Sequence, residues 1–134
     1  MAIFGKKLEP EIAARIPPGQ SLTDRFPVLH YGPVPRIDLE KWDFKLFGLV
    51  NEQVSFTWEE FMQLPQSQVT MDIHCVTRWS KLDTSWEGVL ATDLMKHVEL
   101  KPQAKFVIAH AEYGFTANVP LEVFLDEQTI FAHS

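Results

Sequence analysis

The chain has 134 residues, of which 46% are hydrophobic, 22% charged and 12% aromatic, and its formal net charge is −6 at pH 7. This length and composition predict a globular protein with one core and exclude a chain that is disordered throughout. The acidic balance argues against nucleic acid as a partner, because binding phosphates needs clustered Lys and Arg side chains. The apolar runs are too short to span a bilayer and the first residues lack a secretory signal, so we expect a cytoplasmic protein with no membrane partner.

The first 25 residues predict an extended N-terminal arm, because prolines and glycines interrupt every periodic pattern there. Residues 11–16 allow one or two helical turns before Pro17 and Pro18 end the helix. The folded domain is expected to comprise residues 26–134. Its first ten residues include three prolines, which fix a rigid and non-helical path.

The rest of the chain alternates short strands with short helices. Strands are predicted at residues 42–50, 54–56, 68–75, 106–109, 115–119 and 129–132, with 106–109 as a buried strand. Helices are predicted from the capping box Thr57–Glu60 to Leu64, over 92–99, and from Pro120 to Val123. The polar residues 78–85 predict a loop. This order of elements predicts an α+β fold with a mixed β-sheet and short helices.

Cys75 is the only cysteine, and it lies at the end of an alternating run, between His74 and the polar residues that follow. A single cysteine rules out an internal disulfide. His74 and Arg78 would favour a thiolate if they faced the sulfur, and a thiolate can serve as a metal ligand or as a nucleophile. The alternative is that Cys75 is a small hydrophobic residue of the core.

Two other kinds of chemistry have weaker support. A zinc site needs several Cys or His ligands at regular spacing, and the five histidines are scattered through the sequence. A cysteine hydrolase needs a His and an orienting Asn or Asp beside the nucleophile. His110 and Asn118 are candidates for those roles, but no local motif supports them.

Five segments, taken together, resemble the sulfite oxidase-type molybdopterin-binding domain. They are His30-Tyr31-Gly32-Pro33-Val34-Pro35, Phe47-Gly48-Leu49-Val50, His74-Cys75-Val76-Thr77-Arg78-Trp79-Ser80, Trp86-Glu87-Gly88-Val89 and Tyr113-Gly114-Phe115-Thr116-Ala117-Asn118-Val119-Pro120. The segments come in the family's order, and the resemblance spans residues 26–134. It is closest to the bacterial cytoplasmic members described as sulfite oxidase-like oxidoreductases, and it implies their molybdopterin-binding fold.

The resemblance also implies roles for individual residues. Cys75 would be the catalytic residue and the metal ligand, completing the coordination of molybdenum beside the dithiolene sulfurs of molybdopterin. Other contacts to the cofactor would come from His30, Tyr31, His74, Thr77 and Arg78. The expected function is oxygen-atom transfer or redox chemistry on a small-molecule substrate, with an electron-transfer partner.

The sequence departs from the family's pattern at three places. Leu29 stands where sulfite oxidases have an anion-binding Arg, which argues against sulfite as the substrate, and Phe115 replaces an active-site Tyr. The family's domain continues beyond the last predicted strand into a segment whose basic residues grip the cofactor's phosphate, so we expect the domain to be incomplete at Ser134. The alternative function is a binding or dimerisation module without cofactor, in which an unpaired sheet edge favours homo-oligomers.

Overall fold

The structure is a computed structural model that describes residues 7–27 and 30–134. Leu29, the position at which sulfite oxidases carry an anion-binding Arg, lies outside the described residues, as do residues 1–6 of the predicted arm. None of the helices in the described ranges is both long and apolar enough to cross a membrane.

The chain forms two compact units, each made of two separate segments. The first unit comprises Met1–Val28 and Thr70–Ser85, and the second comprises Leu29–Val69 and Trp86–Ser134. Because the chain passes from one unit to the other several times, each unit depends on pairings between residues that are distant in sequence.

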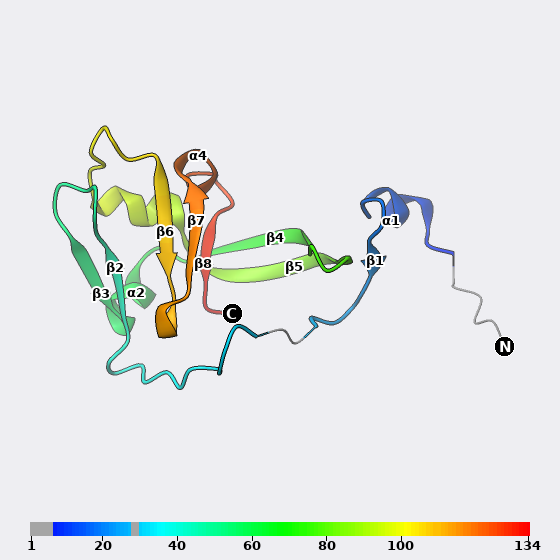
Figure 1. The fold of residues 1–134 in the computed structure, drawn as a ribbon, viewed down its shortest axis with the longest axis horizontal. Helices are drawn as coiled ribbons and strands as arrows, with labels where there is room; N and C mark the ends of the chain where they lie inside the picture. Colours follow the sequence, from blue (N-terminus) through cyan, green and yellow to red (C-terminus); the bar gives the residue numbers. More distant parts are fainter. Residues whose placement is uncertain (1–6, 28–29) are drawn as a thin grey trace. The chain divides into compact units, whose positions relative to one another are not determined.

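The N-terminal segment pairs with a hairpin of two long strands, whose residues 70–85 belong to the first unit (Figure 1). The hairpin consists of β4 (Ser67–His74) and β5 (Trp79–Leu90), which are hydrogen-bonded neighbours. Helix α1 (Pro10–Ala14) begins with a proline in its first turn, where a missing N–H costs nothing. It leads to β1 (Ser21–Leu22), which runs parallel to the beginning of β5.

The prediction of a loop over residues 78–85 is wrong, because β5 begins at Trp79 and runs through that whole region. Two of the polar residues responsible for that prediction are buried in the strand. Ser80 is fully buried, and Thr84 is 6% exposed and donates a hydrogen bond of 2.6 Å to the Met71 carbonyl oxygen. A buried hydroxyl that has a hydrogen-bond partner is compatible with a central strand, so polar residues alone are not evidence for a loop.

The second unit contains an antiparallel pair, β2 (Asp43–Leu46) and β3 (Val54–Thr57), followed by helix α2 (Trp58–Gln63). The predicted capping box is confirmed. The Thr57 hydroxyl accepts from the Glu60 backbone N–H at 3.2 Å, and the Glu60 carboxylate accepts from the Thr57 backbone N–H at 2.8 Å. These two bonds fix the start of α2 and the angle at which it leaves β3.

A second antiparallel pair follows later in the chain, β6 (Phe106–His110) and β7 (Thr116–Pro120), which lie side by side in Figure 1. The short 3₁₀ helix η2 (Glu112–Gly114) joins them, and helix α4 (Leu121–Phe124) follows β7. The strand predicted at 106–109 is present, but it is not buried. Phe106 is 60% exposed, and β6 belongs to a sheet of two strands. An apolar run in the sequence does not reveal whether another layer covers the strand.

The helix predicted over 92–99 is shorter and tighter than expected: α3 (Ala91–Leu94) continues as the 3₁₀ helix η1 (Met95–His97). The last strand, β8 (Ile130–Ala132), pairs antiparallel with the end of β5. Since β5 also pairs in parallel with β1, the sheet is mixed. The predicted α+β fold is therefore confirmed.

The core of the second unit is aromatic. Its buried members include Phe56, Phe61, Val89 and Leu94, of which Val89 and Leu94 are fully buried. Partly buried residues packed against them include Trp42, Phe44 and Phe131. The Phe44 ring packs edge-on against Phe131 with 4.8 Å between the ring centroids, so β2 and β8 share this core.

Candidate functional site

Cys75 lies at the tip of the β4–β5 hairpin, as the first residue of its turn. The Arg78 N–H donates to the Cys75 carbonyl oxygen at 3.0 Å, and the Cys75 N–H donates to the Trp79 carbonyl oxygen at 2.9 Å. Arg78 closes the turn with a φ of +70°, in the left-handed region that non-glycine residues rarely adopt. Arg78 thus occupies a backbone conformation that glycine would adopt with less strain.

The Cys75 thiol is hydrogen-bonded within this turn. The Thr77 hydroxyl donates to Sγ at 3.1 Å. This hydroxyl, together with the Thr77 backbone N–H, lowers the pKa of the Cys75 thiol below its ordinary value, because both donors stabilise the thiolate. The sequence suggested His74 and Arg78 as the source of this effect, but the groups that lower the pKa are Thr77 and, more weakly, the Val76 backbone N–H.

The turn is exposed. Cys75 is half-buried and is not one of the buried core residues, while Val76 is 94% exposed. His74, Thr77 and Arg78 are also exposed. A thiol that is accessible and has a lowered pKa has the environment of a ligand or nucleophile, whereas structural cysteines are buried and inert.

The turn is also held by hydrogen bonds from side chains outside it, which the sequence did not predict. The Gln20 side-chain amide donates to the Cys75 carbonyl oxygen at 2.9 Å, and its oxygen accepts from the Ser80 hydroxyl at 3.2 Å. The Ser80 hydroxyl also contacts Nδ1 of His74 at 2.7 Å. Gln20 comes from the N-terminal segment, 55 residues before Cys75, so no local pattern could have identified it.

A second link joins the N-terminal segment to the hairpin through Arg15. Its guanidinium bonds to both carboxylate oxygens of Asp72, at 2.6 and 3.1 Å, and to Asp83 at 2.6 Å. The Asp83 backbone N–H donates to Asp72 at 2.9 Å. The Arg15 hydrogen bonds, and then this backbone N–H, lower the pKa of the Asp72 carboxyl, so the pair stays charged at neutral pH.

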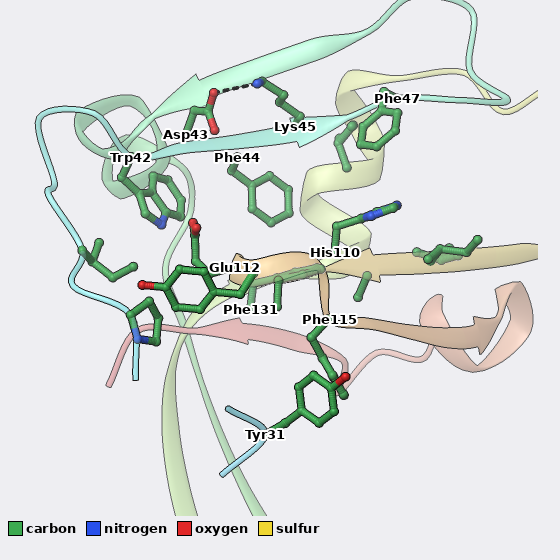
Figure 2. Close-up of a pocket in the computed structure, with 18 of the residues that line it drawn as sticks. Tyr31, Trp42, Asp43, Phe44, Lys45, Phe47, His110, Glu112, Phe115 and Phe131 are labelled. Carbon is green, nitrogen blue, oxygen red and sulfur yellow. Dashed lines mark ion pairs between the residues drawn. The ribbon is translucent and has the colours of Figure 1, made fainter. Parts of the chain in front are cut away.

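The two other predicted cofactor contacts, His30 and Tyr31, belong to the second unit, and both are exposed. Tyr31 is 80% exposed, and the centroid of its ring lies 4.9 Å from that of Phe115. Both rings line a cavity of about 690 Å³ (Figure 2). The cavity has aromatic walls, and its other lining residues include Trp42, Phe44, Phe47, His110, Tyr113 and Phe131.

The structure gives little support for the other two candidates, a zinc site and a cysteine hydrolase. Within residues 7–27 and 30–134, no group of three or more His, Cys, Asp or Glu side chains is arranged to hold a metal ion. His110 and Asn118, the candidate partners of a thiol hydrolase, lie on β6 and β7 in the second unit, where the His110 ring packs against Phe47.

Comparisons with known proteins identify the family of the chain. Residues 31–134 match the family described as the oxidoreductase molybdopterin binding domain. The chain is 42% identical over 132 residues to the uncharacterized oxidoreductase YuiH of Bacillus subtilis, an alignment that covers 98% of this chain and 67% of YuiH. It is 30% identical over 131 residues to YedZ1 of Azospira oryzae, named as a putative protein-methionine-sulfoxide reductase subunit, covering 95% of this chain and 49% of that protein.

Among solved structures, the sulfane dehydrogenase SoxCD from Paracoccus pantotrophus shares the fold, with a TM-score of 0.58 at 14% sequence identity. The match covers 94% of this chain and 44% of the SoxCD chain. The chain thus spans about two thirds of YuiH and about half of each of the other two proteins. The predicted resemblance to a molybdopterin-binding domain is confirmed, and the chain belongs to the family of oxidoreductase molybdopterin binding domains.

Proposed function

We propose that this chain binds molybdopterin and that the Cys75 thiolate is the protein ligand to molybdenum. The observation that carries the proposal is the thiol itself, which is accessible and whose pKa is lowered by donors from Thr77. When bound, the molybdenum centre would supply oxygen-atom transfer and electron transfer. The residues of the turn would position the sulfur and stabilise its negative charge.

The donor set fits such a centre. Molybdopterin brings its own sulfur ligands, so the protein needs to add one soft donor and not a cluster of side chains. Cys75 provides that donor, and the described residues hold no competing group of three or more ligands. Arg78, exposed on the same turn, offers a guanidinium for an anionic part of the cofactor. His30 and Tyr31 stay predictions as contacts of the pterin.

For the substrate we propose a small molecule that gives or takes one oxygen atom. The relative YedZ1 is named as a subunit of a putative methionine-sulfoxide reductase, which makes a sulfoxide the first compound to test. Reduction of a sulfoxide to a thioether removes one oxygen as water and consumes two electrons and two protons. The chain would therefore need an electron-transfer partner.

The proposal is tested by measuring molybdenum in protein expressed in a host that makes the cofactor. The wild-type chain should carry molybdenum, and Cys75→Ser should lower the molybdenum content about tenfold or more, because losing even an outer-shell partner of a metal ligand costs about 10–100-fold in affinity. Val76→Ala is the matched control, since it alters the neighbouring residue of the same turn without touching the thiol. Its molybdenum content should equal that of the wild type.

Two results would contradict the proposal. One is a wild-type chain that is folded and free of molybdenum after expression in a host that loads other molybdenum enzymes, which would favour the binding or dimerisation module. The other is a Cys75→Ser variant that holds as much molybdenum as the wild type, which would show that Cys75 is not the residue that retains the metal.

A further inference from the structure

Behind the Cys75 turn, three side chains form a hydrogen-bonded chain whose proton positions follow from the structure. Gln20 Nε2 lies 2.9 Å from the Cys75 carbonyl oxygen, and Gln20 Oε1 lies 3.2 Å from the Ser80 hydroxyl. The same hydroxyl lies 2.7 Å from His74 Nδ1. Ser80 is fully buried, so its hydroxyl is shielded from water.

The orientation of the Gln20 amide is fixed at its first contact. A backbone carbonyl oxygen only accepts hydrogen bonds, so the Gln20 group that faces Cys75 must be the NH₂. The amide oxygen then faces Ser80, and among the described residues the Ser80 hydroxyl is its hydrogen-bond donor. A hydroxyl has one proton. Since it is donated to Gln20, the Ser80 oxygen must accept from His74.

We propose that Gln20 and Ser80 hold neutral His74 in the tautomer that carries its proton on Nδ1. Nε2 of His74 then has a free lone pair, on an exposed residue next to Cys75. A free histidine side chain favours the opposite tautomer, with its proton on Nε2, so the protein reverses the ordinary preference. His74 is thereby made a hydrogen-bond acceptor, and it would receive an N–H or O–H donor from a ligand bound at the turn. That the ligand is the pterin cofactor rests on the proposed function. The assignment of the tautomer does not depend on it.

The tautomer is measured directly by long-range ¹H–¹⁵N correlation NMR on the ¹⁵N-labelled chain without cofactor. Spectra are recorded near pH 8.5, well above the ordinary imidazole pKa of about 6.5. The His74 signals are those absent from the spectrum of His74→Gln. We expect the pattern of a ring protonated on Nδ1. A ring protonated on Nε2 would overturn the proposal.

Gln20→Ala tests the cause. Without the Gln20 oxygen, the Ser80 hydroxyl is free to donate to Nδ1, so the His74 ring should shift toward the tautomer protonated on Nε2. Thr23→Val is the control, because the Thr23 hydroxyl bonds only locally to Arg25 at 3.1 Å and its substitution leaves the network intact. An unchanged tautomer in Gln20→Ala would show that Gln20 and Ser80 do not set it.

The role of Nε2 as an acceptor is tested in protein loaded with cofactor. His74→Gln keeps an acceptor oxygen close to the place of Nε2, whereas His74→Phe keeps a ring without an acceptor. We expect His74→Phe to retain the cofactor about fivefold less well than the wild type, the effect of losing one hydrogen bond, and His74→Gln to lie closer to the wild type. Equal retention by all three proteins would refute the acceptor role. A wild-type chain without cofactor would refute the proposed function and leave the tautomer measurement standing.

Discussion

At the scale of single residues, the lowered pKa of Cys75 depends on Thr77. The hydroxyl 3.1 Å from Sγ is the first cause of the lowered thiol pKa, and the backbone N–H of the same residue is the second. Both donors stabilise the charged form of the sulfur. The pKa of the thiol is therefore lowered by neutral groups of the turn.

Thr77→Val removes the hydroxyl and keeps the shape of the side chain. We expect the pKa of Cys75 to rise toward its ordinary value without reaching it, because the backbone donor remains. Alkylation of the thiol, measured as a rate against pH, should have its midpoint at higher pH in this variant than in the wild type. Thr77→Ser, which retains the hydroxyl, should restore the wild-type profile. Identical midpoints for Thr77→Val and the wild type would mean that the hydroxyl does not stabilise the thiolate.

The sequence identified the residues of the turn because they are contiguous. His74, Cys75, Thr77 and Arg78 lie within five positions, so one motif contains them all. It did not identify Gln20, whose contact with Cys75 spans 55 residues, and it placed the cause of the thiol's acidity in His74 and Arg78. Charge is visible in a sequence, but a hydrogen bond from a neutral neighbour depends on the conformation of the turn.

At the scale of elements, the pairing of β5 with β8 requires a glycine. A Cβ placed on Gly88 would collide with the carbonyl oxygen of Phe131 and would lie 2.8 Å from the Cα of Ala132. Both obstacles are backbone atoms, which cannot move aside as a flexible side chain can. The resemblance included Gly88 in a motif, and the structure explains the residue by the close approach of two strands.

We therefore expect Gly88→Ala to destabilise the protein by about 1–3 kcal/mol, the usual cost of overpacking a well-packed site. The measurement is the free energy of unfolding from urea titration. Glu87→Ala, at the exposed preceding residue of the same strand, is the control and should change stability little. If the two variants were equally stable, β8 would not be packed against β5 as closely as the structure indicates.

Elements with a strong local signal were predicted well, and those determined by distant partners were not. The capping box fixed the start of α2, because both of its hydrogen bonds form between residues three apart. The beginning of β5 was interpreted as a loop, because its partner β1 lies about 58 positions earlier in the chain and its buried hydroxyls look polar in the sequence. Strand pairing of this kind is decided by tertiary contacts.

At the scale of the whole molecule, the N-terminal segment is an integral part of the first unit. Arg15 holds Asp72 and Asp83 across 57 and 68 residues of sequence. The Asp72 carboxyl has a lowered pKa, so its stabilising contribution is fully present above its ordinary pKa of about 3.9 and is lost as the pH falls through the lower value in the folded chain. The attachment of the N-terminal segment through Arg15 and Asp72 should therefore weaken only in acid.

Arg15→Gln tests this dependence on pH. At pH 7 the variant should unfold at a lower urea concentration than the wild type, and the difference should shrink at pH 2, where more of Asp72 is protonated. Lys41→Gln serves as a control, because its exposed ion pair with Asp38, at 3.6 Å, belongs to the second unit and should contribute little. A difference between Arg15→Gln and the wild type that is the same at both pH values would exclude the carboxylate of Asp72 as its cause.

The contact between Gln20 and Cys75 also has a consequence for how the protein folds. It closes a loop of 55 residues, and the entropy lost in closing a loop grows with its length, whereas the β4–β5 hairpin joins residues that are close in sequence. The contacts within the hairpin can therefore form before this long-range contact. During synthesis the segment that supports it leaves the ribosome first and has no partner until residues 70–85 have followed. The thiol site is complete only after these two parts of the chain have met.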